Sequence, residues 1–392
     1  MKNLMKFVTV LFLVVLLLPA CKDDDETVIE LTCQEQIDTL RINQLQVLGS
    51  HNSYRLRTYE PILQFIYANL DQLPPGFSPD SWDYTHLTLE EQFNAYGIRS
   101  IELDVYNDPD GGLFNMRMGN GLIDESPESN EPALLEPGLK VMHFPDLDYN
   151  TNYLTFKDAL TTVKDWSDSH PRHLPITILV EPKADSPNAL LGDPFTTTIP
   201  FDNTSLETID QEIKAIFGEQ LSKVITPDDV RGNFATLNEA VLAQNWPRIA
   251  DARGKLIFVM IPNGNELEDY LDGHGSLAGR AMFAFSQAGQ PETAFLGFGD
   301  PVADELLIQS QVTSGYMVRA RADANTVEAR EGNYLPLEAA LRSGAHIIST
   351  DYYKADGRPG WSGYVAQLPN GKLAKLNPNF NLEDDLPCDV VE

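Results

Sequence analysis

The sequence has few cysteines, few basic residues and no second long apolar run. Only three cysteines occur in 392 residues, and 28 Lys and Arg stand against 58 Asp and Glu, which gives a formal net charge of −30. This balance argues against binding to nucleic acid and against electrostatic docking on anionic lipid. No apolar run after residue 20 reaches the roughly 18 residues that a membrane span needs. No repeat of 20 to 50 residues is present.

The first twenty residues have the pattern of a targeting segment. Two lysines precede an apolar run over residues 7–18, and a Leu-Pro-Ala tripeptide leads to Cys21. This arrangement resembles a bacterial lipoprotein signal, in which Cys21 is lipidated and becomes the mature N-terminus; an ordinary secretory peptide is the alternative. Removal of residues 1–20 would leave 26 basic against 58 acidic residues, a net charge near −32.

An acidic stretch, residues 23–26, follows Cys21 and resembles the surface-export signal of bacterial lipoproteins, with a solvated tether as the alternative. We therefore expect a protein of the bacterial cell envelope, held at the outer membrane or cell surface by its lipid anchor. An oxidising compartment would allow Cys33 and Cys388 to join the two ends of the chain by a disulfide, a pairing that the sequence leaves open.

Short β-rich apolar runs alternate with helical patterns, which is typical of a mostly parallel sheet. Eight strands are predicted, at 45–50, 98–106, 139–144, 176–182, 255–261, either 282–285 or 295–298, 316–321 and 346–351. Helical patterns cover 89–96, 156–169, 207–217, 237–243 and 336–343. Eight strands with interleaved helices favour an α/β fold, a (β/α)₈ TIM-type barrel.

The chain shows no convincing linker between domains. We predict a signal peptide over 1–20, a tether and N-terminal segment over 21–40, and a single barrel domain with a C-terminal tail over 41–392. Residues 107–137, rich in Gly, Pro, Asn, Asp and Glu, form a stretch too long for a plain connection and are predicted to be a loop over the barrel mouth.

Four predicted strands end in polar residues, at the end where a TIM-type barrel builds its active site. Glu102 and Asp104 are two residues apart and therefore face the same side of one strand, while Glu181 ends another. Such carboxylates repel one another unless one is protonated or a cation lies between them. With the amide oxygen of Asn52 the set offers oxygen ligands only, which favours Ca²⁺, with Mg²⁺ less favoured, over zinc. A solvated strand end, or an ion pair with Arg99, is the alternative.

His51 and His143 come from different predicted strand ends. Imidazoles on either side of a substrate held by the metal would act as general base and general acid. For His143 alone, a buried and hydrogen-bonded structural histidine is the alternative.

Together these motifs resemble the calcium-dependent phosphoinositide-specific phospholipase C family, a group of PLC-like phosphodiesterases. The ordered set is His51-Asn52, Glu102-Leu103-Asp104, His143 and Glu181. Residues 49–54, 98–106, 141–144, 155–183, 319–323 and 343–353 further resemble the bacterial members. The resemblance, from about residue 45 to 353, implies a TIM-type barrel, a bound Ca²⁺ and cleavage of a phosphodiester through a cyclic phosphate.

The resemblance also implies roles for individual residues. It makes His51 and His143 the catalytic pair and Asn52, Glu102, Asp104 and Glu181 the calcium ligands. Lys183 matches a basic position near the phosphate or inositol. Arg321, with Arg319 as the alternative, is a candidate phosphate clamp because a guanidinium fork suits phosphate oxygens. In the implied mechanism the inositol 2-hydroxyl attacks phosphorus, Glu102 or Glu181 takes its proton, His51 stabilises the developing charge and His143 protonates the leaving oxygen.

Two other functions are weighed against this one. A glycerophosphodiester phosphodiesterase uses the same barrel, but its His-Arg-Gly start is replaced here by His51-Asn52-Ser53. A non-catalytic surface lipoprotein that captures lipids or glycans would not need both histidines and four oxygen ligands. A lyase acting on sphingolipid-type diesters stays open. The expected partners are a phospholipid or other phosphodiester substrate and, through the anchor, a membrane; we expect a monomer that does not bind nucleic acid.

Overall fold

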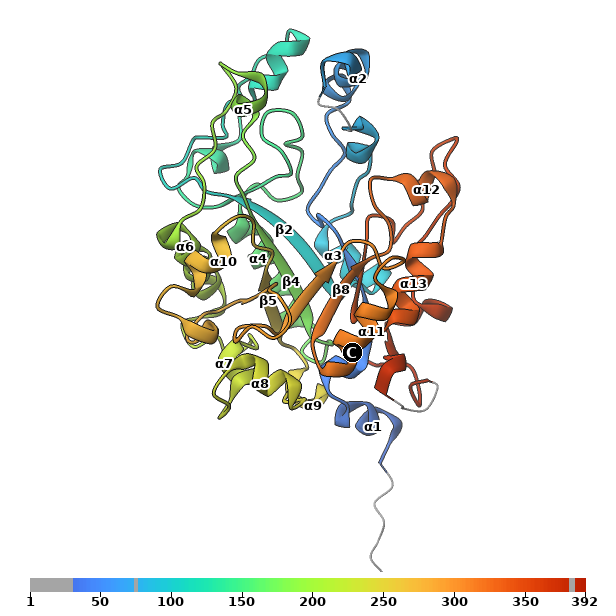
Figure 1. The fold of residues 1–392 in the computed structure, drawn as a ribbon. Coiled ribbons are helices and arrows are strands. Elements are labelled where there is room, and N and C mark those ends of the chain that lie inside the picture. Colours follow the sequence, from blue (N-terminus) through green and yellow to red (C-terminus); the bar gives the residue numbers. More distant parts are fainter. Residues whose placement is uncertain (1–30, 74–76, 381–384) are drawn as a thin grey trace, which may run out of the picture.

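The computed structural model describes residues 31–392 apart from 74–76 and 381–384, so Cys21 and the predicted signal segment lie outside the described residues. Within the described part, eight parallel strands form a barrel at the centre of the molecule (Figure 1). Their hydrogen-bonded order is β6-β5-β4-β2-β1-β9-β8-β7. They are β1 (Leu45–Ser50), β2 (Ser100–Tyr106), β4 (Ile176–Lys183), β5 (Leu256–Met260), β6 (Phe283–Ala284), β7 (Phe295–Phe298), β8 (Met317–Arg321) and β9 (Ile347–Thr350). A single parallel bridge, Phe285 with Phe295, joins the two ends of this order. The predicted barrel fold is confirmed, as a nearly closed barrel.

One predicted barrel strand is wrong. Residues 139–144 contain only the short strand β3 (Lys140–Val141), which pairs antiparallel with the end of β2 outside the barrel. The reason is that β4 pairs directly with β2 over seven residues and leaves no place for a strand between them. The two alternatives for the sixth strand are both strands, β6 and β7, so the number of barrel strands is still eight among the described residues.

Helices lie around the sides of the barrel and beyond both of its ends (Figure 1). They are α1 (Cys33–Thr39), α2 (Glu60–Ala68), α3 (Leu89–Tyr96), α4 (Phe156–Ser169), α5 (Pro187–Leu191), α6 (Asn203–Phe217), α7 (Pro227–Arg231), α8 (Leu237–Leu242), α9 (Ile249–Ala252), α10 (Glu266–Leu271), α11 (Glu305–Ser314), α12 (Val327–Glu331) and α13 (Leu335–Ser343). The predicted bounds of α3 and α4 are confirmed, and α6, α8 and α13 differ from their predicted bounds by a few residues. No helix of the described residues is long and apolar enough to cross a membrane.

Local signals explain where these helices begin and end. The hydroxyl of Thr88 accepts a hydrogen bond from the Glu91 amide in a capping box at the start of α3. Gly97 and Gly344 end α3 and α13 in the left-handed region, at φ of 63° and 80°, which glycine adopts without a steric penalty. These turns deliver the chain into β2 and β9, which carry site residues.

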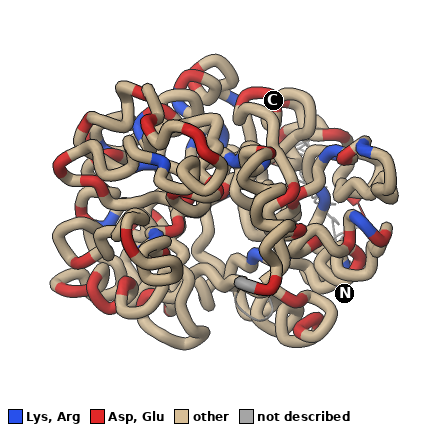
Figure 2. The backbone as a smooth tube through the Cα atoms, turned by 90° about the horizontal axis from the view of Figure 1, so that it is seen from above, with Lys and Arg blue, Asp and Glu red and all other residues tan. Residues whose placement is uncertain are grey.

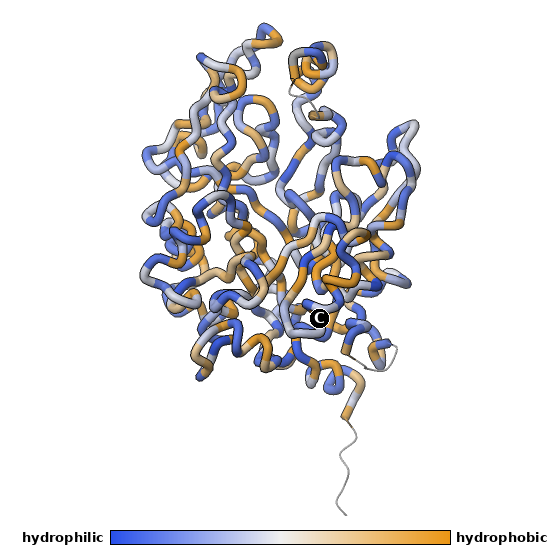
Figure 3. Tube along the Cα trace, viewed as in Figure 1, coloured by the Kyte–Doolittle hydropathy of each residue, from blue (hydrophilic) through white to orange (hydrophobic). Residues whose placement is uncertain are grey.

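Apolar side chains fill the space inside the barrel and between its strands and helices. Figure 3 shows hydrophobic stretches in the centre of the molecule and along the helices around it. A second, smaller cluster, formed by Ile62, Ile66, Tyr106, Phe114 and Met142 with their neighbours, lies beyond the end of β2. It packs α2 against residues 107–137, which contain the 3₁₀ helices η4 (Met118–Ile123) and η5 (Pro132–Leu135). This segment lies at the mouth of the barrel, above the strand ends (Figure 1).

The two ends of the described chain meet at the opposite end of the barrel. Strand β10 (Ala374–Leu376) pairs antiparallel with the first half of β1. Cys33 and Cys388 form a disulfide with their Cα atoms 6.1 Å apart. The pairing that the sequence left open is therefore present, and it fixes α1 to the C-terminal segment.

Candidate active site

Side chains from five barrel strands meet at the C-terminal ends of the strands. They are His51 and Asn52 after β1, Glu102 and Asp104 on β2, Glu181 and Lys183 on β4, Arg319 and Arg321 on β8, and Asp351 after β9. All five strands are parallel, so these ends lie at one edge of the barrel. His143 reaches the region differently, from the loop after β3.

The three carboxylates predicted to bind metal lie together. Asp104 and Glu181 are directly opposite each other in the parallel pairing of β2 and β4, and Glu102 is two residues before Asp104 on the same face. One carboxylate oxygen from each of the three lies within 4.8 Å of the others. Glu102 and Asp104 are each 1% exposed. We call these three residues the acidic triad.

Three buried oxygen atoms at the triad make no hydrogen bond within the described residues, two from Asp104 and one from Asn52. Burial, and then the charge of Glu181, raises the pKa of Asp104 well above its usual value. Buried oxygens without partners are costly unless a cation satisfies them. The residues present therefore fit a hard cation with oxygen ligands, which is the preference of calcium.

Asn52 is aimed by its backbone. Its φ of 45° lies in the left-handed region, which asparagine tolerates better than most side chains. Its amide nitrogen donates a hydrogen bond of 3.1 Å to the Tyr84 hydroxyl, so the side-chain oxygen is left for another partner. Ser53, the next residue, bonds to both backbone groups of Glu102 and joins this turn to β2.

Two cations lie beside the triad. Arg319 donates a 2.7 Å hydrogen bond to Glu102, and the Lys183 ammonium lies 3.6 Å from Glu181 and 3.9 Å from Asp104. Against the effect of burial, the charges of His51 and Arg319 hold the pKa of Glu102 below its usual value. Lys183 therefore lies beside the triad, and its predicted role near the phosphate or inositol stays a prediction.

His51 lies between two carboxylates. Its Nδ1 is 2.8 Å from Asp351 and its Nε2 is 3.4 Å from Glu102. Asp351 also accepts a 2.9 Å hydrogen bond from Arg321. Although burial opposes ionisation, His51 and Arg321 keep the pKa of Asp351 below its usual value. An ionised Asp351 orients the imidazole and places its proton on Nδ1.

His143 has a similar support, built from different elements. Its Nδ1 is 2.7 Å from the buried Asp148, which also binds Arg55 and Thr58. Against the effect of burial, Arg55 and His143 hold the pKa of Asp148 below its usual value. Burial lowers the pKa of His143 itself, and Asp148 opposes that effect. The prediction that His143 ends a barrel strand is wrong, but the loop after β3 still holds its ring by an ionised carboxylate.

A chain of contacts connects the two histidines. The Tyr84 hydroxyl lies 3.4 Å from His51 Nδ1, and the Arg55 guanidinium stacks 4.3 Å from the centre of the Tyr84 ring. Arg55 in turn binds Asp148 beside His143. The sequence analysis missed Tyr84, Arg55 and Asp148, because they lie in loops that show no motif or apolar periodicity. It included Asp351 only as the last residue of the predicted strand 346–351.

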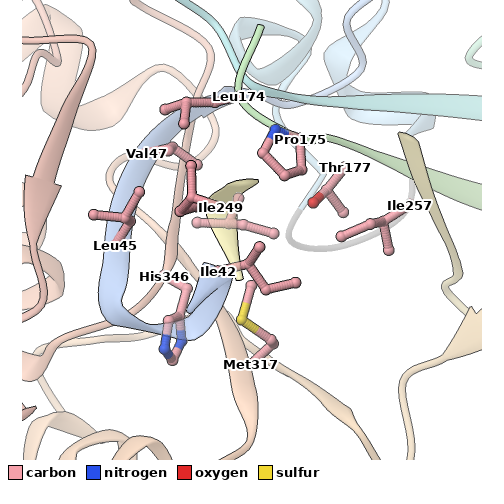
Figure 4. A pocket seen from close by; sticks show the side chains of 11 residues that line it. Ile42, Leu45, Val47, Leu174, Pro175, Thr177, Ile249, Ile257, Met317 and His346 are labelled. Carbon is pink, nitrogen blue, oxygen red and sulfur yellow. The ribbon is translucent and has the colours of Figure 1, made fainter. Parts of the chain in front are cut away.

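A separate apolar pocket lies at the other end of the barrel, lined by β1, the start of β4 and their neighbours (Figure 4). Its single titratable side chain is His346, whose ring nitrogens bond to the Val318 amide and the Asn43 carbonyl. With both nitrogens engaged, this pocket offers no group for catalysis.

Acidic residues outnumber basic ones over the chain as a whole (Figure 2), so the cations inside the mouth are local exceptions.

Comparison with known proteins agrees with this geometry. Residues 40–378 match the family model of phosphoinositide phospholipase C, Ca²⁺-dependent. A calcium-dependent phosphoinositol-specific phospholipase C from a Pseudomonas species, in its apo form, is 17% identical with a TM-score of 0.52, over 87% of this chain and 96% of that chain. Its myoinositol complex gives 17% and 0.51, over 88% and 99%.

A Ca²⁺-dependent phosphatidylinositol-specific phospholipase C from Streptomyces antibioticus is 20% identical with a TM-score of 0.47, over 80% of this chain and 95% of that chain. No curated protein sequence matches the chain. The likeness to the Pseudomonas structures supports the barrel fold, and the family match covers most of the chain. The chain therefore belongs to the Ca²⁺-dependent phosphoinositide phospholipase C family and is a calcium-dependent phosphodiesterase.

Proposed function

We propose that the protein cleaves the phosphodiester of a phosphatidylinositol-type lipid in two steps, through a cyclic inositol phosphate, with His51 and His143 as the acid–base groups. The observation that carries the proposal is a pair of histidines that each have Nδ1 against a buried carboxylate, with His51 also 3.4 Å from Glu102 of the acidic triad. His143 Nε2 has no hydrogen-bond partner among the described residues, and His51 Nε2 lies 3.4 Å from Glu102.

In the first step, the inositol 2-hydroxyl oxygen forms a bond to phosphorus while the bond from phosphorus to the glyceride oxygen breaks. Glu102 or Glu181 accepts the hydroxyl proton. His51, held by Asp351, stabilises the negative charge that develops on the phosphoryl oxygens. A calcium ion held by Asn52 and the acidic triad would add Lewis-acid stabilisation of that charge and lower the pKa of the hydroxyl.

His143 supplies the proton that the leaving glyceride oxygen needs. Its Nε2 has no hydrogen-bond partner among the described residues, and its side chain is 22% exposed, so the proton faces the mouth. In the second step, neutral His143 takes a proton from water as the water oxygen attacks phosphorus, and the inositol 2-oxygen leaves with a proton returned by the carboxylate. Asp148 holds the Nδ1 proton and the orientation of the His143 ring through both steps, while the Nε2 proton is given up and taken back.

Product analysis by phosphorus NMR tests this proposal. The chain without residues 1–21 is given phosphatidylinositol with Ca²⁺ or with chelator, beside His51→Ala and the matched control His170→Ala, which removes a histidine at the end of α4. We expect cyclic inositol phosphate with Ca²⁺ in the wild type and the control, and none in His51→Ala. Acyclic inositol phosphate as the first product would contradict the mechanism.

We further propose that Cys21 is lipidated and that the barrel mouth points away from the anchoring membrane. Nine residues lie between Cys21 and Leu31, and the ten steps from one Cα to the next span at most about 35 Å. Helix α1 lies at the end of the barrel opposite the mouth (Figure 1). A domain of roughly 360 residues is about 50 Å across. The tether is therefore too short for the mouth to turn onto its own membrane, and the substrate comes from another membrane or from solution.

Vesicle assays separate these cases. The lipidated protein is reconstituted in vesicles, and phosphatidylinositol is placed either in the same vesicles or in separate ones. We expect turnover mainly of the separate vesicles, while the chain without residues 1–21 uses both equally. Turnover confined to lipid in the same vesicles would contradict the proposed orientation.

A further inference from the structure

Arg319 occupies one of the carboxylates that the calcium site needs. Its terminal nitrogen donates to Glu102 Oε2 at 2.7 Å, while Glu102 Oε1 faces His51 at 3.4 Å. Both oxygens of this proposed ligand are thus engaged with positively charged or protonatable groups. Lys183 neutralises the other side of the triad through Asp104 and Glu181. The triad is therefore partly neutralised by the protein's own side chains.

The guanidinium of Arg319 also has an unused donor. Its Nε is buried and has no hydrogen-bond partner among the described residues. Arg321, two residues later on the same strand, differs in this respect. Its Nε donates to the Asp323 carbonyl at 3.0 Å and its terminal nitrogen to Asp351 at 2.9 Å. Arg321 is therefore tied to the support of His51, whereas Arg319 keeps a buried donor that needs an acceptor.

We propose that Arg319 is an exchangeable counter-cation: it holds Glu102 when calcium is absent and donates to the substrate phosphate when calcium takes Glu102. The proposal rests on the proposed function, in which Glu102 is a calcium ligand. Two cations close to one carboxylate repel each other, so bound calcium weakens the pairing of Arg319 with Glu102. Phosphate oxygens then accept from both edges of the guanidinium, including the Nε donor that is unpaired in the structure.

This exchange couples calcium to the substrate. In the free enzyme, calcium competes with Arg319 for Glu102, which lowers calcium affinity. A bound phosphate draws Arg319 away and removes that competition. By linkage, calcium and phosphate each strengthen the binding of the other by the same factor. The enzyme would then hold calcium weakly until a phosphodiester is present.

Calorimetric titration with Ca²⁺ alone tests the first half of the proposal without any turnover. Arg319→Gln removes the competing charge, and we expect it to bind Ca²⁺ about tenfold more tightly than the wild type. Arg319→Lys keeps the charge and should stay close to the wild type. The matched control is Arg321→Gln, because Arg321 lies on the same strand but is paired with Asp351. The calcium affinity of this variant should differ from that of the wild type by less than about threefold. Equal or weaker calcium binding by Arg319→Gln would overturn the exchange.

The coupling in the second half is measured first in the wild type, which needs no variant, and is then compared with the coupling in Arg319→Gln. Saturating myo-inositol 1-phosphate should lower the calcium dissociation constant of the wild type by a clearly larger factor than that of Arg319→Gln. Absence of this coupling in the wild type, or an equal coupling in Arg319→Gln, would overturn the proposal. Failure of the wild type to bind Ca²⁺ at all would overturn the calcium site in the proposed function as well, so the two failures are distinguishable.

Discussion

The carboxylate of Asp104 would bind calcium, but its charge destabilises the folded protein when no calcium is bound. It is 1% exposed, both carboxylate oxygens lack hydrogen-bond partners among the described residues, and the Lys183 ammonium is 3.9 Å away. Burial raises the pKa of Asp104 well above its usual value, and Glu181 adds to the effect. For an acid whose pKa is raised by folding, ionisation destabilises the folded state, and the penalty grows as pH rises above the unfolded pKa. At neutral pH without calcium, Asp104 therefore costs stability.

Asp104→Asn removes the charge and keeps the shape. Relief of a buried, poorly compensated charge stabilises the metal-free protein by about 1–3 kcal/mol. Unfolding entropy of about 2.1 cal/mol/K per residue gives roughly 0.75 kcal/mol/K for this chain, so Tm should rise by about 1–4 °C. In the wild type, calcium at about 100 times its Kd adds about 2.7 kcal/mol, or about 3–4 °C. The variant should lose that calcium shift.

Scanning calorimetry at pH 7 with Ca²⁺ or EGTA measures both effects. Asp108→Asn is the matched control, because Asp108 is equally buried, at 2% exposure, but lies 3.0 Å from the buried Lys140. Removing its charge leaves Lys140 without its ion-pair partner and should cost about 3–5 kcal/mol. The two variants should therefore move Tm in opposite directions in EGTA. A fall in Tm for Asp104→Asn, or a full calcium shift in that variant, would refute the reasoning.

Three further predictions follow from other parts of the structure. Asp351→Asn and Asp148→Asn each keep the size of the group that orients a histidine but remove its charge. In steady-state assays on a soluble substrate, each variant should lower kcat by about 10- to 1000-fold with little change in KM. A change in KM alone would contradict this. Burial lowers the pKa of His346 from 6.5 to about 4. As pH falls, the unfolded chain takes up a proton first, so the free energy of unfolding falls by about 3 kcal/mol between pH 6.5 and 4. In urea unfolding, His346→Gln should show a shallower pH dependence of this free energy than the wild type, and an unchanged pH dependence would count against the reasoning. Cys33→Ser with Cys388→Ser should lower the free energy of unfolding by about 2–5 kcal/mol under non-reducing conditions, and equal urea midpoints with and without the disulfide would show that it contributes nothing.

The barrel was predictable because its strands carry their own local signals. β1 and β4 are short runs rich in apolar residues and buried along most of their length, as strands of a parallel sheet are. Residues 139–144 misled the prediction because Leu139, Val141 and Met142 are buried, but against the outside of β2 and the second cluster. Apolar periodicity reports burial and cannot report which neighbour provides it.

The acidic triad was predictable for a geometric reason. A spacing of two residues in a strand sets Glu102 and Asp104 on one face, and the parallel register brings Glu181 opposite Asp104. Asp148 and Arg55 gave no such signal. They are 93 positions apart in the chain and meet only because the loops after β1 and β3 pack together.

Both histidines have the same support, although the elements that build it differ. Each Nδ1 contacts a buried carboxylate, and each carboxylate also binds an arginine: Asp351 with Arg321, Asp148 with Arg55. A buried carboxylate without the arginine would tend to take up a proton and would then no longer fix the tautomer of the imidazole. The arginine therefore keeps the carboxylate ionised, and the carboxylate keeps the ring oriented. Arg319 and Glu102 form the same kind of pair, but there calcium would replace the arginine as the partner of the carboxylate.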